Sequence, residues 1–399
     1  MRFVSVLWLT LLFFSCQTKS DISIKKRQAQ QIINKIQHKL LPDQRDGIFE
    51  VKTTIVGKQL VIKGKTDKRP IKQAIFTALK NNHIKAVDSL VILPAESVKN
   101  KIAVTRLSVA NLRQLPKHAS ELVTQTLMGM PLRVYEQKNG FYHVQTPEGY
   151  YAWVDAAGIV LLNRKDFKSW LQKPKIIITA HCGKTYQEPY YTAQPVSDYV
   201  LNDVFALEDL NENFALVSYP DGRQAYIGRD NFVPLTQFEV TASRYLTAQD
   251  LLHMAKKYLG IPYLWGGTSV KGLDCSGFTK NVLAQANYLL PRDASQQAKI
   301  GKEVKLTPDF RNLKPGDLLF FGHKKNNIIK ITHVAIHLNN GRIIHATGEV
   351  KIESLNKNDA DFNPQRYKSL LTARCVFKQI NREFSKYYTL DCPILTDHP

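Results

Sequence analysis

The stretch "GLDCSGF" at residues 272–278 holds a cysteine at a position where a helix is expected to begin. Cys275 comes shortly after the glycine pair of "LWGG" and before apolar residues at helical spacing. Unpaired N–H groups and the positive dipole end of a helix N-terminus lower the pKa of a thiol. The sequence therefore predicts that Cys275 is a nucleophile with a lowered pKa.

The base that such a nucleophile needs is expected in "ITHVAIHLNNGRIIHATG", residues 331–348. We interpret this segment as a hairpin, in which alternate residues of a strand share a face. A three-residue loop at 339–341 would pair His345 with Ala335 and so bring it to the face of His333. His333 would then act as the base, and His345 would hold its imidazole in the useful tautomer. His337 lies on the same face and is interpreted as a bystander.

An alternative is that Cys275, His333 and His345 are three zinc ligands, because Cys/His sets bind zinc. The cysteines and histidines do not follow the usual zinc spacings. The thiol mechanism is favoured, and no metal or other cofactor is expected.

The elements around these residues indicate an α+β domain. Apolar residues at helical spacing run from Leu251 to Leu259, where Gly260 and Pro262 end the helix. A second helix should begin near Cys275, and alternating strand patterns follow at 316–321, 331–338 and 342–347. Helices followed by a meander of strands are typical of an α+β layout.

The whole series "YLGIPYLWGG…GLDCSGF…LPRDASQQ…LKPGDLLFF…THVAIHL…IIHATG" resembles the NlpC-type family of cell-wall cysteine peptidases, which have a papain-like fold. The resemblance covers residues 245–379. It implies that Cys275 is the nucleophile, His333 the base and His345 the polar third member. It also implies that Tyr263 donates its hydroxyl near the oxyanion, beside the backbone N–H of Cys275.

An internal repeat precedes this domain. Residues 141–154, "FYHVQTPEGYYAWV", and residues 214–227, "FALVSYPDGRQAYI", share one pattern of strand, Pro-acid-Gly turn and strand. We predict two small β-barrels, at 103–163 and 175–237, which resemble the bacterial SH3-like modules of cell-wall enzymes. Residues 21–100 read as helix, hairpin, helix and strand, a spacer module without a catalytic constellation.

SH3-like modules placed before the peptidase resemble one subgroup, the γ-D-glutamyl-L-diamino acid endopeptidases, or dipeptidyl-peptidase VI. There the first module closes one end of the cleft, so that only murein peptides with a free N-terminal L-Ala enter and L-Ala-γ-D-Glu is released. The matching positions are Tyr150, Ser276 and Asp293, and a carboxylate with hydroxyl groups suits an ammonium group. The alternative for Asp293 is a surface pair with Arg292. A one-residue slip would exchange Tyr150 with Tyr151.

The N-terminus, "MRFVSVLWLTLLFFSC", has one Arg and then an apolar run too short to span a bilayer, which is typical of a secretory signal. Ser15 before Cys16 suggests a lipoprotein signal at 1–16, with Cys16 acylated; the alternative is cleavage elsewhere. We expect an exported monomer, lipid-anchored on the periplasmic side of the cell envelope.

The net charge is +21, but the basic residues are dispersed, which together with the export signal argues against nucleic acid as a partner. An anionic wall or lipid surface, or simply a basic soluble surface, would account for the charge. Among the other cysteines, the sequence does not decide whether Cys375 and Cys392 form a disulfide. Two other functions compete with the murein-peptide enzyme: an autolysin acting on polymeric wall, and a non-catalytic wall-binding lipoprotein.

Overall fold

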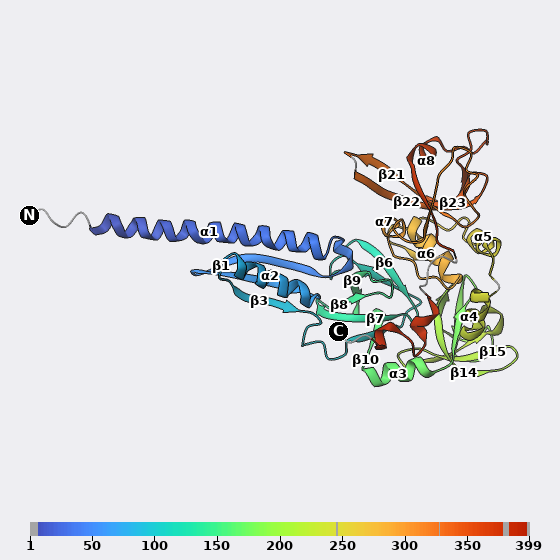
Figure 1. Cartoon of the computed structure of the whole chain (residues 1–399). Coiled ribbons are helices and arrows are strands. Elements are labelled where there is room, and N and C mark those ends of the chain that lie inside the picture. Colours follow the sequence, from blue (N-terminus) through green and yellow to red (C-terminus); the bar gives the residue numbers. More distant parts are fainter. Residues whose placement is uncertain (1–6, 245, 327, 378–382, 397–399) are drawn as a thin grey trace, which may run out of the picture. The chain divides into compact units, whose positions relative to one another are not determined.

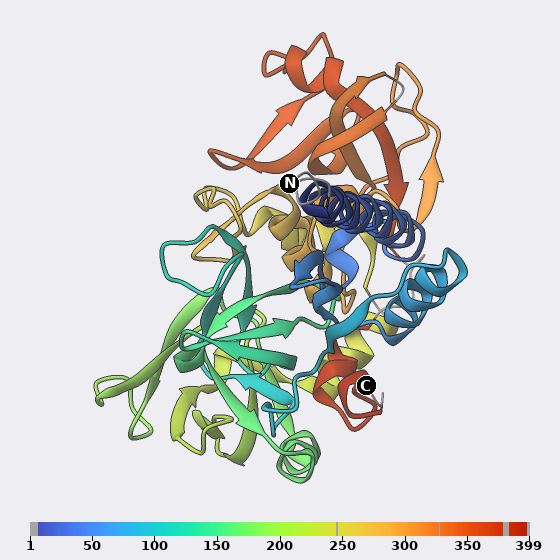
Figure 2. The ribbon, with the colours of Figure 1, turned by 90° about the vertical axis from the view of Figure 1, so that its left-hand side faces the viewer.

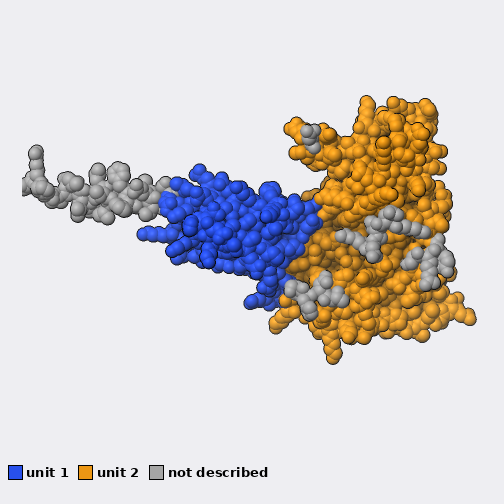
Figure 3. Space-filling view, viewed as in Figure 1, with its two compact units in different colours: residues 1–98 blue, residues 99–399 orange. Residues whose placement is uncertain are grey.

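The computed structural model describes residues 7–244, 246–326, 328–377 and 383–396, without the side chains of 7–20, 243, 244 and 396. The chain divides into two compact units, residues 1–98 and 99–399 (Figure 3).

The first unit is a small α/β module. Its elements are α1 (Leu7–Leu40), β1 (Phe49–Val56), β2 (Gln59–Thr66), α2 (Arg69–Asn81) and β3 (Val87–Ile92). Pro70 in the first turn of α2 suits a helix start, and α2 is the crossover that lets β3 pair in parallel with β2. Ile33, Ile62 and Ile75 are fully buried between the helices and the sheet. In the described part of the chain, no helix is both long and apolar enough to cross a membrane.

The second unit begins with two β-barrel modules, each built on a seven-stranded sheet (Figure 1). Module 1 contains β4 (Ile102–Thr105), β5 (Val109–Arg113), β6 (Leu122–Leu127), β7 (Pro131–Lys138), β8 (Phe141–Gln145), β9 (Tyr151–Asp155) and β10 (Ile159–Leu162). Module 2 contains β11 (Lys175–Ile178), β12 (Cys182–Tyr186), β13 (Pro195–Val200), β14 (Val204–Leu210), β15 (Phe214–Ser218), β16 (Gln224–Gly228) and β17 (Phe232–Pro234). The repeated sequence forms the hairpins β8–β9 and β15–β16, and α3 (Arg164–Gln172) follows module 1.

The rest of the second unit has the expected α+β layout. Its helices are α4 (Leu235–Arg244), α5 (Ala248–Lys256), α6 (Cys275–Gln285), α7 (Ala294–Gln297), α8 (Pro364–Ser369) and α9 (Pro393–Thr396). A short ribbon, β18 (Thr268–Ser269) and β19 (Gly272–Leu273), precedes α6. The main sheet has the order β20-β25-β21-β22-β23-β24: β20 (Lys302–Val304), β21 (Leu318–Lys325), β22 (Ile328–Asn339), β23 (Arg342–Thr347), β24 (Glu349–Ser354) and β25 (Leu370–Cys375).

Helix α6 lies between this sheet and the barrel modules (Figure 1; Figure 2). On the sheet side, its Phe278 and Val282 share a buried core with Phe320 of β21 and Ile336 of β22. On the module side, Thr268 of β18 donates its backbone N–H to Oε1 of Gln125 in β6, at 2.8 Å. The catalytic elements are thus packed directly against module 1.

Candidate active site

Cys275 is the first residue of α6 and is buried. Asp274 caps the helix, since its carboxylate accepts the N–H of Gly277 at 2.7 Å. The Cys275 sulfur lies within hydrogen-bonding reach of the backbone N–H of Val334, the residue after His333. The structure therefore brings the cysteine and the first histidine together.

The two histidines and a carboxylate form a hydrogen-bonded chain. His333 Nε2 lies 2.7 Å from His345 Nδ1, and His345 Nε2 lies 3.0 Å from Glu353 Oε2 in β24. Since the carboxylate of Glu353 accepts, His345 carries its proton on Nε2, and its Nδ1 accepts the Nε2–H of His333. The remaining nitrogen, Nδ1 of His333, is therefore the one with a lone pair for the thiol proton.

The hairpin reaches the expected alignment by a different turn. Asn339 pairs with Arg342, so the turn is the two residues Asn340 and Gly341, both with positive φ. A bulge at Leu338 shifts the register by one residue, so that Ile336 pairs with Ile344 and His345 comes level with Ala335. The prediction of one shared face for His333 and His345 is confirmed, whereas the three-residue loop is wrong.

His337 has a structural environment of its own. Its Nδ1 lies 3.0 Å from the carbonyl oxygen of Lys314, and its Nε2 accepts the N–H of Gly341 at 3.3 Å. Both ring nitrogens are therefore engaged in hydrogen bonds to backbone groups next to the hairpin, and neither is available for proton transfer.

The expected lowering of the cysteine pKa is wrong. Burial and the neighbouring Asp274 carboxylate raise the pKa of the Cys275 thiol to about 11. Burial also lowers the pKa of His333 well below its usual value, with the charge of Arg366 acting in the same direction. The resting pair is therefore a neutral thiol beside a neutral imidazole, and the helix N-terminus does not outweigh desolvation.

Asp274 is held by an arginine that sequence reasoning did not assign. Arg292 is buried and forms a two-pronged ion pair with Asp274, while its Nη1 donates to the Ser276 hydroxyl at 2.9 Å. Its Nε donates to the hydroxyl of Thr124 in β6, at 3.0 Å. A strand of module 1 thus helps to hold the cap of the helix that carries Cys275.

The close approach of module 1 also explains the first glycine of the pair before Cys275. Gly266 has φ +77°, and a Cβ there would lie 2.2 Å from the carbonyl oxygen of Leu122 in module 1. Only glycine allows the loop to approach the module so closely.

The expected ammonium-binding residues gather around Arg292. Ser276 is hydrogen-bonded to it, and Tyr150 and Asp293 lie within electrostatic range of its guanidinium. Tyr151 lies elsewhere, with its hydroxyl 3.4 Å from that of Tyr135 inside module 1. Of the two tyrosines, Tyr150 is therefore the one near the site.

Asp293 begins α7 in a capping box with Gln296. Arg292 forms its ion pair with Asp274 rather than with Asp293, contrary to the alternative considered for this residue. Tyr263 is half-buried, and burial together with the nearby Cys275 raises the pKa of its hydroxyl. It therefore stays a neutral hydrogen-bond donor close to the thiol.

Glu353 and Arg292 were missed because each is recognisable only once the fold brings its partner, His345 or Asp274, next to it. The one available signal for Glu353 was its place on the strand after His345, at a position that pairing can bring level with Ile343. Within the described residues, no group of three or more His, Cys, Asp or Glu side chains is arranged to hold a metal ion. Cys375 and Cys392 are both thiols, so no disulfide joins them. The side chain of Cys16 lies outside the described residues.

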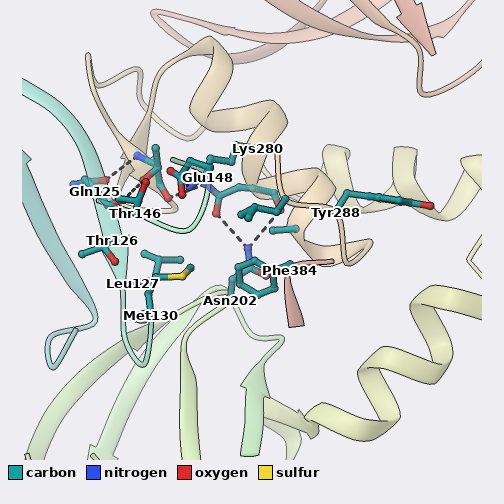
Figure 4. Close-up of a pocket in the computed structure, with 14 residues that line it drawn as sticks. Gln125, Thr126, Leu127, Met130, Thr146, Glu148, Asn202, Lys280, Tyr288 and Phe384 are labelled. Carbon is teal, nitrogen blue, oxygen red and sulfur yellow. Dashed lines mark hydrogen bonds and ion pairs between the residues drawn. The ribbon is translucent and has the colours of Figure 1, made fainter. Parts of the chain in front are cut away.

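A small pocket, lined by both polar and apolar side chains, lies where the two modules meet α6 (Figure 4). Glu148 of the β8–β9 turn and Lys280 of α6 line it and form an ion pair of 2.8 Å, with the carboxylate side chain 1% exposed. Neither oxygen of this carboxylate has a well-oriented hydrogen bond among the described residues. Cys275, His333 and His345 are not among the described residues that line this pocket, so the ion pair is interpreted as a structural contact.

Known proteins share these features. Residues 260–363 match the NlpC/P60 family, and residues 112–159 match the bacterial dipeptidyl-peptidase SH3 domain. The chain is 28% identical over 238 residues to the gamma-D-glutamyl-L-lysine dipeptidyl-peptidase of Bacillus cereus, covering 57% of this chain and 68% of the relative. It is 27% identical over 264 residues to dipeptidyl-peptidase 6 of Lysinibacillus sphaericus, covering 64% and 92%.

A crystal structure of an NlpC/P60 family protein from Bacillus cereus has the same fold, with a TM-score of 0.59 and 22% identity, over 69% of this chain and 99% of that one. The buried cysteine at a helix start, facing a histidine chain on a sheet, defines a papain-like cysteine peptidase. The chain thus contains an NlpC/P60 domain, preceded by a bacterial dipeptidyl-peptidase SH3 domain.

Proposed function

We propose that this protein hydrolyses the γ-D-Glu–diamino acid bond of murein peptides with a free N-terminal L-Ala. The observation that carries the proposal is the contact between module 1 and the cap of the catalytic helix, through Thr124, Arg292 and Asp274. Relatives named gamma-D-glutamyl-L-lysine dipeptidyl-peptidase and dipeptidyl-peptidase 6 support it.

In the proposed mechanism, Nδ1 of His333 takes the proton of the Cys275 thiol as the sulfur attacks the γ-carbonyl carbon. The backbone N–H of Cys275 and the Tyr263 hydroxyl stabilise the oxyanion. The C–N bond then breaks, and His333 returns the proton to the amine of the diamino acid. Water, deprotonated by His333, hydrolyses the thioester and releases L-Ala-γ-D-Glu. His345 and Glu353 keep the imidazole oriented and stabilise its charged form.

Selection for a free N-terminus is proposed to come from Tyr150, Ser276 and Asp293. An ammonium group offers three donors, which the carboxylate and hydroxyl oxygens of these side chains can accept. An acetylated N-terminus has lost both the charge and two of the donors, so it should be rejected.

The test is mass spectrometry of digests of L-Ala-γ-D-Glu-diaminopimelate, its L-lysine counterpart, their N-acetylated forms and intact sacculi. We expect cleavage of the free peptides, no cleavage after Cys275→Ala, and activity that persists in chelator. Asp293→Ala should remove most of the activity and most of the discrimination against acetylated peptide. Equal rates on free and acetylated peptides would reject the proposal, and release of fragments from sacculi would favour the autolysin.

We further propose that the enzyme is a monomeric lipoprotein, exported to the periplasmic side of the envelope and acylated at Cys16. Metabolic labelling with radioactive palmitate should mark the wild type but not a Cys16→Ser variant. Light scattering of the purified protein should give the mass of one chain.

A further inference from the structure

Arg366 belongs to the short helix α8, whose start is attached to the histidine chain. The N-cap residue Asn363 accepts the backbone N–H of Arg366 through Oδ1, at 3.0 Å. Its Nδ2 donates to Oε2 of Glu353 at 2.8 Å, the same oxygen that binds His345. The position of Arg366 is thus fixed relative to the catalytic histidines.

The side chain of Arg366 lies over the ring of Phe321, which neighbours the ring of His333. Its Cζ lies 5.8 Å from the ring centroid of Phe321, and that ring lies 5.8 Å from the ring of His333. Its charge acts on the thiol of Cys275 and on the hydroxyl of Tyr263. The guanidinium therefore packs against a ring that neighbours His333, within electrostatic range of both groups that would flank the scissile bond.

The guanidinium group is half-buried and has unused hydrogen-bonding capacity. Within the described chain, no carboxylate forms an ion pair with it, since Glu353 binds His345 and Lys351 instead. The charge of this partly desolvated cation lowers the pKa of His333 and so makes the base weaker. Packing against Phe321 alone does not offset that cost. A substrate anion would compensate for that cost.

We propose that Arg366 binds a carboxylate of the substrate next to the scissile bond. The inference rests on the proposed function, which supplies two such groups: the α-carboxylate of the γ-linked D-Glu, and the α-carboxylate of the diamino acid. The planar guanidinium can bind either one with two parallel hydrogen bonds. Arg366 is then a specificity residue for the anionic form of the peptide.

The test compares kcat/KM for three peptides: L-Ala-γ-D-Glu-L-Lys, the same peptide with the D-Glu carboxylate amidated, and the same peptide with the C-terminal carboxylate amidated. Each is measured with the wild type, Arg366→Gln, Arg366→Lys and the control Lys368→Gln, an exposed cation on the same helix. Amidation of the recognised carboxylate should cost the wild type about 10- to 100-fold. Arg366→Gln should lose a similar factor on the free peptide and little more on the amidated one.

The peptide that shows this coupling identifies the carboxylate. Arg366→Lys should keep part of the discrimination between free and amidated peptide, so the inference can be tested even if the Gln variant folds poorly. Lys368→Gln should match the wild type. Equal effects of both amidations on the wild type and on the Arg366 variants would overturn the inference.

A binding measurement separates this inference from the proposed function. Alkylation of Cys275 by iodoacetamide should be slowed by the product L-Ala-γ-D-Glu if the D-Glu carboxylate is the one bound, and this protection should weaken in Arg366→Gln. Hydrolysis without any coupling to Arg366 would reject the inference alone. Absence of both hydrolysis and protection in the wild type would reject the proposed function and this inference with it.

Discussion

In the proposed mechanism, the residue that decides the chemistry is His333, because its neighbours determine which nitrogen is basic and at what pH. Burial lowers its pKa well below the usual value, and burial raises the pKa of Cys275 to about 11. Both shifts favour a neutral thiol and a neutral imidazole at rest, so in the proposed mechanism the nucleophile forms only as the proton moves to His333.

The first prediction concerns pH. Activity requires neutral His333, whose lowered pKa keeps it neutral below pH 6.5, so kcat/KM should stay high under mildly acidic conditions and fall only as the pH drops through that lowered pKa. No limb from thiol ionisation should appear between pH 7 and 9. The check is a kcat/KM profile from pH 4.5 to 9.5, and an acid limb at or above pH 6.5 would contradict it.

The second prediction concerns Glu353, which acts through His345. The charge of this carboxylate raises the pKa of both His333 and His345. Glu353→Gln keeps the size but removes that charge, so we expect kcat to fall about 10-fold or more and the acid limb to move to lower pH. A loss of activity without any movement of the acid limb would mean that Glu353 serves only to support the fold.

At the scale of elements, the β22–β23 hairpin positions His333 and His345, and the hydrogen bonds of His337 stabilise that hairpin. The third prediction is that His337→Phe lowers stability but not the turnover of folded enzyme. The change leaves the N–H of Gly341 and the carbonyl of Lys314 without this partner, at a cost of about 2–4 kcal/mol. Urea unfolding and active-site titration would measure the two effects, and His333→Ala should show the reverse pattern, with stability nearly kept and turnover lost.

The same hairpin shows how far the sequence leads. Strand alternation together with an assumed three-residue loop predicted that His333 and His345 share a face, since a register shifted by one residue would have sent His345 to the other side. The bulge at Leu338 could not be predicted, since a two-residue turn with a bulge and a three-residue loop give the same alignment. The pKa of Cys275 was predicted with the wrong sign because burial and the Asp274 charge depend on packing that no local pattern contains.

At the scale of the whole molecule, contacts between module 1 and the peptidase domain support the site, and the proposed specificity depends on them. Two hydrogen bonds cross this boundary, one between Gln125 and Thr268 and one between Thr124 and Arg292. A buried ion pair between Glu148 and Lys280 lies at the same boundary. Removing one member of a buried pair leaves the other charge uncompensated.

The fourth prediction follows from that pair. Lys280→Met should destabilise the protein by about 3–5 kcal/mol, and adding Glu148→Leu should recover much of the loss. The matched control is Arg311→Met at the exposed Arg311–Asp309 pair, where we expect a change below about 1 kcal/mol. Urea denaturation of the four proteins would measure these values, and equal effects at the buried and exposed pairs would contradict the prediction.

The hydrogen bond from Arg292 to Thr124 has a consequence for how such proteins can diversify. A module that is only tethered to its neighbour can be replaced without touching the chemistry. Here the module supplies an atom that holds the cap of the nucleophile's helix, so an exchanged module would have to bring a hydroxyl to the same place. Module 1 and the peptidase domain should therefore be inherited together, and chimeras that cross between them should be inactive even on the smallest soluble peptides.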